Sequence, residues 1–297
     1  MLKFEVQTTT QAEEAICDIL NEVFNTYPIV LHNIETDVIC VSVYFNEGEI
    51  NPNEAIREVE ERLKLLNPII ESNAFKINIS TVKYEDWAES WKRHFKPLRF
   101  GNSLLIKPQW SKVKPPSGAK VVILDPGLAF GTGQHATTKF CLQQIVKYRP
   151  KNKKQNSSFL DIGTGSGILA IAATKLGYSP VVAFDFDETA VEIAKKNAKR
   201  NRVAEKIYLF QQDVLKLDEN PEQKYDLICA NITADILIEA RMKIVSRLNS
   251  EGRLVLAGIL RTQFESVKQA YQECSLSLLR SKIENEWQSG LFISERD

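Results

Sequence analysis

The chain has 297 residues, of which 43% are hydrophobic and 26% are charged, and it contains 13 glycines. This composition excludes collagen-like, coiled-coil and disordered proteins, and no apolar run approaches the ~18 residues that a membrane span needs. The 38 Lys and Arg residues balance the 38 Asp and Glu residues, and the length favours about two domains.

The cysteines and histidines argue against a disulfide framework and against a metal site. The five cysteines, at positions 17, 40, 141, 229 and 274, are widely spaced and form no C-x-x-C pair. None of the three histidines lies near a cysteine or carboxylate at the spacing of metal ligands. We therefore predict no disulfide and no metal. We also expect a cytoplasmic protein, because the first residues lack the basic start and apolar stretch of a signal peptide.

The amino-terminal segment predicts a small α+β domain. Residues 2–7 alternate between apolar and polar, which is the period of a half-buried strand, and apolar residues at 16, 19, 20 and 23 line one face of a helix. The further predicted elements are strands 29–35 and 37–45, a helix over 53–66, and a strand over 75–80. The order β-α-β-β-α-β is that of a ferredoxin-like fold, which we place at residues 1–84.

The charge of this domain differs from that of the rest of the chain. Residues 1–84 hold 14 Asp and Glu against 6 Lys and Arg, a net charge of −8, which leaves +8 on residues 85–297. An acidic domain suits a basic partner and repels phosphates. A solvated acidic surface without a partner is the alternative.

Residues 85–98 predict a linker helix. Trp87, Trp91 and either His94 or Phe95 recur at helical intervals, and such an aromatic stripe either packs between domains, which we favour, or binds a partner. The segment SKVKPPSGAK, residues 111–120, predicts a surface loop.

From Lys120 onward, strands, loops and helices alternate. The predicted strands are 120–124, 157–162, 180–184, 206–210, 225–230 and 252–258. Because they are almost continuously apolar, they predict a parallel sheet that helices cover on both faces. Residues 276–282 and 290–295 lack an intervening helix and predict an antiparallel hairpin at the sheet edge.

Three glycines follow the strand at 157–162, in the stretch FLDIGTGSGILAIAA. Glycines at a strand-to-helix turn let a nucleotide-like ligand approach main-chain N–H groups, although a purely structural turn remains the alternative. Gly163, Gly165 and Gly167 give G-x-G-x-G, and Ile168 stands where the dinucleotide fingerprint G-x-G-x-x-G has its third glycine. This spacing disfavours a dinucleotide.

Three carboxylates near this turn are candidate ligand contacts. Asp185 ends the next strand, where a carboxylate accepts from the ribose hydroxyls of either NAD or S-adenosylmethionine (SAM). Asp161 can pair with a cationic amino group, and Asp213 either accepts from an adenine amino group or is a plain loop residue. No Lys or Arg occurs between Phe159 and Ala173, which favours SAM over a pyrophosphate.

A second glycine-rich stretch, LDPGLAFGTGQHATTKFCL, joins a strand to a helix. Thr137 and Thr138 stand where the helix should begin. Hydroxyl and free N–H groups at a helix start suit a carboxylate, although either threonine could instead cap its own helix.

These motifs resemble the PrmA-type ribosomal protein methyltransferases. The resemblance lies in WAESWKRHFKPLRFG, DPGLAFGTGQHATT, FLDIGTGSGILAIAA, AFDFDETAVEIAKKNAKRN and ICANI, from Trp87 to about Leu260. The amino-terminal domain resembles the family in size and strand order. The resemblance implies a doubly wound, seven-stranded, Rossmann-like SAM-dependent methyltransferase domain, at residues 99–297. It also implies that SAM contacts Thr138, Gly163, Asp185 and Asn231, and that the substrate is the amino groups of large-subunit ribosomal protein eleven.

The end of the fourth strand bears on the substrate. Asn231 begins NITA, which lacks the prolines and the aromatic residue of the N-P-P-Y turns that hold planar bases or amides, so an aliphatic amine fits better. We expect Asn231 to be catalytic by accepting a hydrogen bond from that amine. His135 is either a proton acceptor or structural, and Phe130 either contacts cations through its ring or belongs to the core.

The expectation is a SAM-dependent protein-lysine N-methyltransferase that trimethylates a basic ribosomal protein recruited by the acidic domain. We expect no direct readout of nucleic acid and no membrane. The alternatives are methylation of another protein, an NAD-dependent oxidoreductase, and a SAM-binding module without catalysis.

Overall fold

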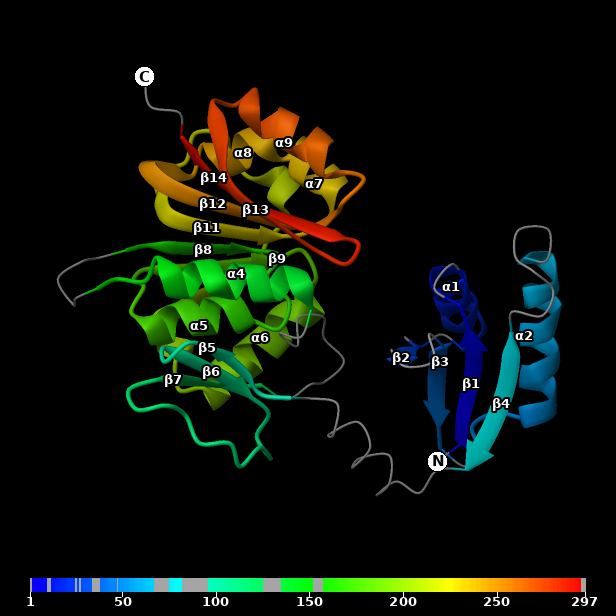
Figure 1. Cartoon of the computed structure of the whole chain (residues 1–297). Helices are drawn as coiled ribbons and strands as arrows, with labels where there is room; N and C mark the ends of the chain where they lie inside the picture. Colours follow the sequence, from blue (N-terminus) through cyan, green and yellow to red (C-terminus); the bar gives the residue numbers. More distant parts are fainter. Residues whose placement is uncertain are drawn as a thin grey trace. The chain divides into compact units, whose positions relative to one another are not determined.

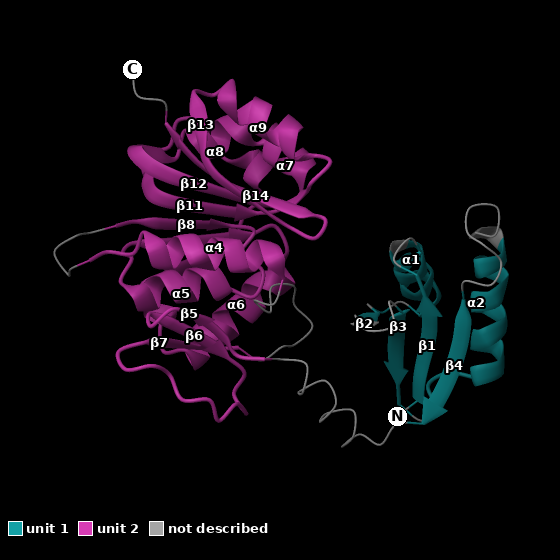
Figure 2. Cartoon of the chain, viewed as in Figure 1, with its two compact units in different colours: residues 1–94 teal, residues 95–297 magenta. Residues whose placement is uncertain are grey.

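The computed structural model describes residues 2–9, 12–24, 26, 28–33, 38–46, 48–66, 75–81, 96–124, 135–151 and 157–294. The chain forms two compact units, residues 1–94 and 95–297 (Figure 2). Residues 85–95 of the predicted linker helix, with its tryptophans, lie outside the described residues, as does Phe130. Residues 96–98 are described and are not helical, because Leu98 begins a strand. No helix within the described ranges is long and apolar enough to cross a membrane.

The first unit has the predicted ferredoxin-like order of elements. Its elements are β1 (Leu2–Thr8), α1 (Glu13–Phe24), β2 (Ile29–Asn33), β3 (Val38–Phe45), α2 (Pro52–Leu66) and β4 (Lys76–Thr81). The strands lie in the order β2-β3-β1-β4, and every pair is antiparallel. The apolar positions of the alternating strand β1, Phe4 and Val6, are fully buried with Ile16 and Leu20 of α1. The alternation therefore predicted the buried face correctly.

The second unit is built on a seven-stranded sheet, which confirms the predicted fold. Its strands are β8 (Phe159–Ile162), β9 (Val181–Asp185), β10 (Ile207–Gln211), β11 (Tyr225–Asn231), β12 (Leu248–Leu260), β13 (Leu276–Glu284) and β14 (Trp287–Ser294). They lie in the order β10-β9-β8-β11-β12-β14-β13. The first five are parallel, and β13 and β14 form the predicted antiparallel hairpin at the edge. The strand order reverses between β8 and β11, where ligands of such sheets bind.

Helices cover both faces of this sheet (Figure 1). The helices are α4 (Ala136–Lys147), α5 (Ile168–Leu176), α6 (Glu188–Arg200), α7 (Ala234–Glu239), α8 (Arg241–Val245) and α9 (Phe264–Gln272). Residues of α4, α5 and α6 share one buried cluster with one face of the sheet, and residues of α7, α8 and α9 share a second cluster with the other face. The two clusters hold the strands rigidly between them, so the residues at the strand ends are held in place.

One predicted strand lies in a different sheet. We expected residues 120–124 in the large parallel sheet, but β7 (Lys120–Ile123) belongs to a three-stranded sheet with β5 (Leu98–Phe100) and β6 (Leu104–Lys107). This small sheet packs on the helices α4 and α5, with Leu104, Ile106 and Val122 in their cluster. An apolar strand pattern shows that a strand is buried, but not which sheet contains it. The short strands β5 and β6, of three and four residues, were not predicted from the sequence.

Candidate functional site

The glycine turn joins β8 to α5, as predicted. The backbone angles of the turn and its packing against neighbouring residues require glycine. Gly163, Gly165 and Gly167 have φ values of +71°, +52° and +79°, which L side chains rarely adopt. A Cβ on Gly163 would lie 2.3 Å from Ile232 Cγ2, and a Cβ on Gly167 would lie 3.0 Å from Ala194 Cβ in α6. Backbone conformation and close packing therefore account for two of the three glycines without any ligand.

Asp161 is the most unusual group beside the turn. Its side chain is completely buried, and its Oδ2 accepts hydrogen bonds from Thr164 Oγ1 at 2.7 Å and from the Ala170 N–H at 3.2 Å. Its Oδ1 has no partner among the residues that the structure describes. Burial raises the pKa of Asp161 to about 7, and the nearby charge of Asp185 acts in the same direction. A buried acceptor without a partner is costly, and the N–H of a ligand would satisfy it.

Asp185 is the last residue of β9, as the sequence predicted. Its Oδ2 accepts from the Gly165 N–H at 2.9 Å, and its Oδ1 accepts from the Asp187 N–H at 3.2 Å. The two bonds fix the carboxylate at the carboxyl edge of the sheet, and each oxygen keeps a lone pair for a further donor. Asp187 caps α6, because its side chain accepts from the Thr189 N–H at 2.8 Å.

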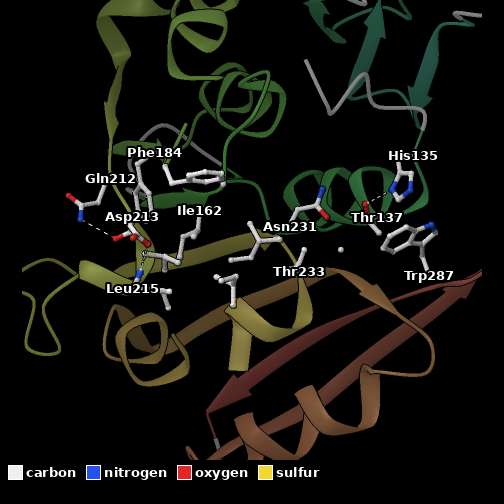
Figure 3. A pocket seen from close by; sticks show the side chains of 16 residues that line it. His135, Thr137, Ile162, Phe184, Gln212, Asp213, Leu215, Asn231, Thr233 and Trp287 are labelled. Atoms are coloured by element: carbon white, nitrogen blue, oxygen red, sulfur yellow. Dashed lines mark hydrogen bonds between the residues drawn. The ribbon is translucent and has the colours of Figure 1, made fainter. Parts of the chain in front are cut away.

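A cavity of about 650 Å³ lies at the carboxyl ends of β8, β9 and β11. Its lining residues are His135, Thr137, Ile162, Gly163, Phe184, Phe186, Gln212, Asp213, Val214, Leu215, Asn231, Ile232, Thr233, Ile236, Gly258 and Trp287. Most of the wall is apolar. The polar side chains gather at two ends, with Gln212 and Asp213 at one end and His135, Thr137 and Asn231 at the other (Figure 3).

The first end of the cavity holds Asp213 and a residue that sequence analysis missed. Asp213 lines the cavity, and its Oδ1 accepts from the Leu215 N–H at 2.9 Å, where it caps the short 3-10 helix Val214–Lys216. Phe186 follows Asp185 directly and is 75% exposed at the cavity wall. Because this exposed ring lies at the cavity wall, it is available to stack on a flat ligand. The sequence did contain a signal for Phe186, namely an aromatic residue immediately after the carboxylate that ends a strand.

The second end brings Thr138 and Asn231 together, although 93 positions separate them in the sequence. Asn231 ends β11, and its Nδ2 donates to Thr138 Oγ1 at 3.5 Å. Its Oδ1 is buried and has no partner within the described ranges. Thr137 and Thr138 are both buried in the first turn of α4, whose N-cap residue is His135. Neither threonine caps the helix, so that alternative is wrong.

His135 and Trp287 form the wall beside Asn231. His135 Nδ1 lies 2.6 Å from Thr137 Oγ1, and the two rings of His135 and Trp287 meet edge to face with centroids 4.8 Å apart. Burial lowers the pKa of His135, and this effect outweighs the negative charges of Glu284 and Glu286, which act to raise it. The imidazole is therefore neutral near pH 7. Trp287 was not predicted at this wall, because the last strand was expected to begin at residue 290, three residues too late.

No Lys or Arg side chain lines the cavity among the described residues. A pyrophosphate would therefore find no countercharge, while the carboxylates of Asp161, Asp185 and Asp213 all lie at the same edge of the sheet. This arrangement suits a ligand that carries hydroxyl, amino and cationic groups and an apolar ring system.

Comparison with known proteins agrees with this chemistry. The profile of the family described as "Ribosomal protein L11 methyltransferase (PrmA)" matches residues 1–293. The chain is 35% identical to the ribosomal protein L11 methyltransferase of Caldanaerobacter subterraneus subsp. tengcongensis over 97% of both chains. It is 36% identical to that of Caldicellulosiruptor saccharolyticus over 95% of both chains.

A solved structure extends the likeness to the fold. The crystal structure of ribosomal protein L11 methylase from Lactobacillus delbrueckii subsp. bulgaricus has a TM-score of 0.60 and 31% identity. It covers 68% of this chain and 100% of that chain. With a profile match over nearly its whole length, the chain belongs to the ribosomal protein L11 methyltransferase (PrmA) family of SAM-dependent, Rossmann-like methyltransferases.

Proposed function

We propose that the protein transfers methyl groups from SAM to lysine side-chain or amino-terminal amines of large-subunit ribosomal protein eleven, up to the trimethylated state. The observation that carries this proposal is the buried, unpaired Oδ1 of Asn231 at the wall of an apolar cavity without cations. Such an acceptor suits a substrate that donates an N–H. Family membership adds the reaction class and the identity of the protein substrate.

The donor site extends from the glycine turn to the first end of the cavity. SAM supplies an electrophilic methyl group on a cationic sulfur. Asp185 accepts from the ribose hydroxyls, Asp213 accepts from the adenine amino group, and the exposed ring of Phe186 stacks on the adenine. The unpaired Oδ1 of Asp161 accepts from the amino group of the methionine moiety. Gly163 and Thr138 complete the site, the first by exposing backbone and the second by its hydroxyl at the start of α4.

Asn231 serves the amine that receives the methyl group. A free lysine amine has a pKa near ~10.4 and is protonated in water, but an apolar cavity that also holds a sulfonium disfavours the charged form. Asn231 Oδ1 then accepts an N–H of the neutral amine and directs its lone pair toward the donor. Because an amide cannot take up a proton, the neutral imidazole of His135 is the proton acceptor available at this end of the cavity. Positioning of the two reactants supplies most of the rate.

The acidic first unit recruits the basic substrate. Its net charge of −8 over residues 1–84 attracts a basic ribosomal protein and accelerates the encounter. A ribosomal protein substrate also implies that the reaction takes place in the cytoplasm. Methylation of a different basic protein is the second candidate, because the same charge would recruit it.

The test is methyl transfer from labelled SAM to purified ribosomal protein eleven, with mass spectrometry of the modified amines. A second basic protein of similar size distinguishes the two candidates. Asn231→Ala should lower turnover at saturating SAM by about 100-fold, since it removes the acceptor that aligns the amine. Calorimetry on the same variant separates SAM binding from turnover. Full turnover of this variant would show that Asn231 does not align the amine.

A further inference from the structure

The small three-stranded sheet lies in a stretch of sequence that contains cations and no acidic residue. Residues 96–124 contain six Lys and Arg and no Asp or Glu, whereas the whole chain has an acidic residue in about every eight positions. Five of the six cations are exposed: Lys96, Arg99, Lys112, Lys114 and Lys120. We call these five residues, with Lys175 and Arg202, the basic platform. The cavity described above contains none of them.

The loop that carries part of the platform is held in place. Lys107, the sixth cation, points inward and donates from Nζ to the carbonyls of Ser111 and Val113, at 2.9 and 3.0 Å. Leu105, on the same face of β6 by alternation, is fully buried, so the loop over residues 108–119 folds back on this face. Lys112 and Lys114 are therefore presented from a loop with fixed backbone.

The platform continues onto the adjoining helices. Asn201, which follows α6, donates to the Ile123 carbonyl at 2.7 Å and accepts from its N–H at 2.8 Å, so β7 is tied to the end of α6. Arg202 comes next in the chain, and Lys175 lies in the last turn of α5. Burial lowers the pKa of Lys175, and the positive charges of Arg202 and Lys120 lower it further. Lys120, Lys175 and Arg202 therefore lie close enough together to repel one another.

Ordinary structural roles do not explain this concentration of charge. Lys175 and Arg202 lie at helix carboxyl ends, where a cation offsets the helix dipole. Arg99, Lys112, Lys114 and Lys120 lie on strands or a loop and have no such role. Within the part of the chain that the structure describes, no ion pair joins these four to a carboxylate. Arg99 donates from Nη2 to the Lys114 carbonyl at 3.5 Å, and a polyanion would lower the repulsion among the four cations.

We propose that the basic platform binds the phosphate backbone of RNA, independently of base sequence, at a surface separate from the methyl-transfer cavity. Rows of Lys and Arg without a deep pocket suit evenly spaced phosphates, which are bound with release of counterions. Trp110 is half-buried in the loop that carries Lys112 and Lys114, and aromatic residues interleaved with cations are typical of surfaces that bind single strands. Phe100 instead packs against the buried cluster of α4 and α5. The contact reads charge and not bases.

The test measures binding of the full-length protein to a fluorescein-labelled 20-nucleotide uridine RNA by anisotropy, over a series of KCl concentrations. The test variant, K112Q/K114Q/K120Q, removes three exposed cations of the platform. The matched control, K224Q/K268Q/R280Q, removes three cations outside it. Melting temperatures of both variants check that the fold is intact.

We expect the wild type to bind with a steep salt dependence and the control to match it. The platform variant should bind about tenfold more weakly at low salt, and its slope of log K against log salt should be shallower by about 2, or ~0.7 for each lost phosphate contact. Equal slopes and affinities for wild type and platform variant would overturn the proposal. Absence of RNA binding, or equally tight binding of polyglutamate, would overturn it as well.

Binding of a labelled duplex DNA is measured in the same way. Weaker binding of DNA than of RNA supports the proposal, and tighter binding of DNA would contradict the choice of RNA. None of these measurements depends on methyl transfer. Methylation of the isolated ribosomal protein by the platform variant, at the wild-type rate, would show that the two sites are separate.

Discussion

The contact between Gly163 and Ile232 predicts how strongly the glycine turn depends on its neighbours. Gly163 has φ of +71°, and a Cβ there would lie 2.3 Å from Ile232 Cγ2. A left-handed backbone costs an L side chain about 1–2 kcal/mol, and overpacking costs about 1–3 kcal/mol more. Gly163→Ala should therefore reduce the free energy of unfolding by about 2–5 kcal/mol. For a domain of this size the melting temperature falls by about 10 °C.

A second glycine separates the two contributions. Gly118 has φ of +77°, but a Cβ there would meet nothing within 4 Å, so Gly118→Ala should lose only the backbone part, about 1–2 kcal/mol. Urea unfolding of both variants gives the difference. A double-mutant cycle with Ile232→Ala, which removes the contacting methyl group, should show a favourable coupling of about 1–3 kcal/mol.

The same substitution should affect the ligand site. Ile232 lines the cavity, so a methyl group on Gly163 pushes it toward the ligand and should weaken SAM binding in calorimetry. If Gly163→Ala and Gly118→Ala lose the same free energy of unfolding and the cycle shows no coupling, Ile232 does not pack against Gly163 and the explanation is wrong.

Three further substitutions or deletions test other parts of the site. Because the folded-state pKa of Asp161, about 7, lies above its ordinary value of 3.8, this carboxyl stabilises the fold below about pH 4 and loses that contribution as the pH rises through 7. At pH 8, Asp161→Asn should therefore have a free energy of unfolding higher than that of the ligand-free wild type, by at most about 4 kcal/mol, and at pH 4 this difference should vanish. The variant should also bind SAM less tightly. A difference in unfolding free energy that is constant with pH would refute the raised pKa. Phe186→Ala should leave the melting temperature unchanged and weaken SAM binding by about tenfold, because stacking is lost. Tyr208→Ala, which removes another exposed ring outside the cavity, should change neither quantity. Equal SAM affinities for the wild type and both variants would show that Phe186 is not part of the site. Deletion of residues 1–84 should abolish methylation of the protein substrate and leave SAM affinity intact, and loss of SAM binding in a folded deletion variant would contradict recruitment by the first unit.

Local patterns in the sequence predicted the elements well where the pattern was long. The alternation of Phe4 and Val6 in β1 identified a buried face, and the almost continuous apolar strands identified a sheet covered on both sides. Asp185 could be placed at a strand end because an apolar run stops there. In each case the information is contained in neighbouring residues.

Contacts between distant segments could not be predicted in this way. No local pattern shows that Ile232 packs against Gly163, or that Asn231 meets Thr138, because these pairs depend on how the strands assemble. Trp287 reaches the wall beside His135 only because the edge hairpin starts earlier than its apolar residues suggested. The placement of β7 in the small sheet likewise follows from its packing on α4 and α5.

The most direct test of the account is calorimetry of the intact protein with SAM and, separately, with NAD. The carboxylate of Asp213 and the exposed ring of Phe186 line the cavity, and no cation does so among its described lining residues, so we predict saturable heat with SAM and none with NAD. Saturable binding of NAD together with no binding of SAM would contradict the assignment of the site.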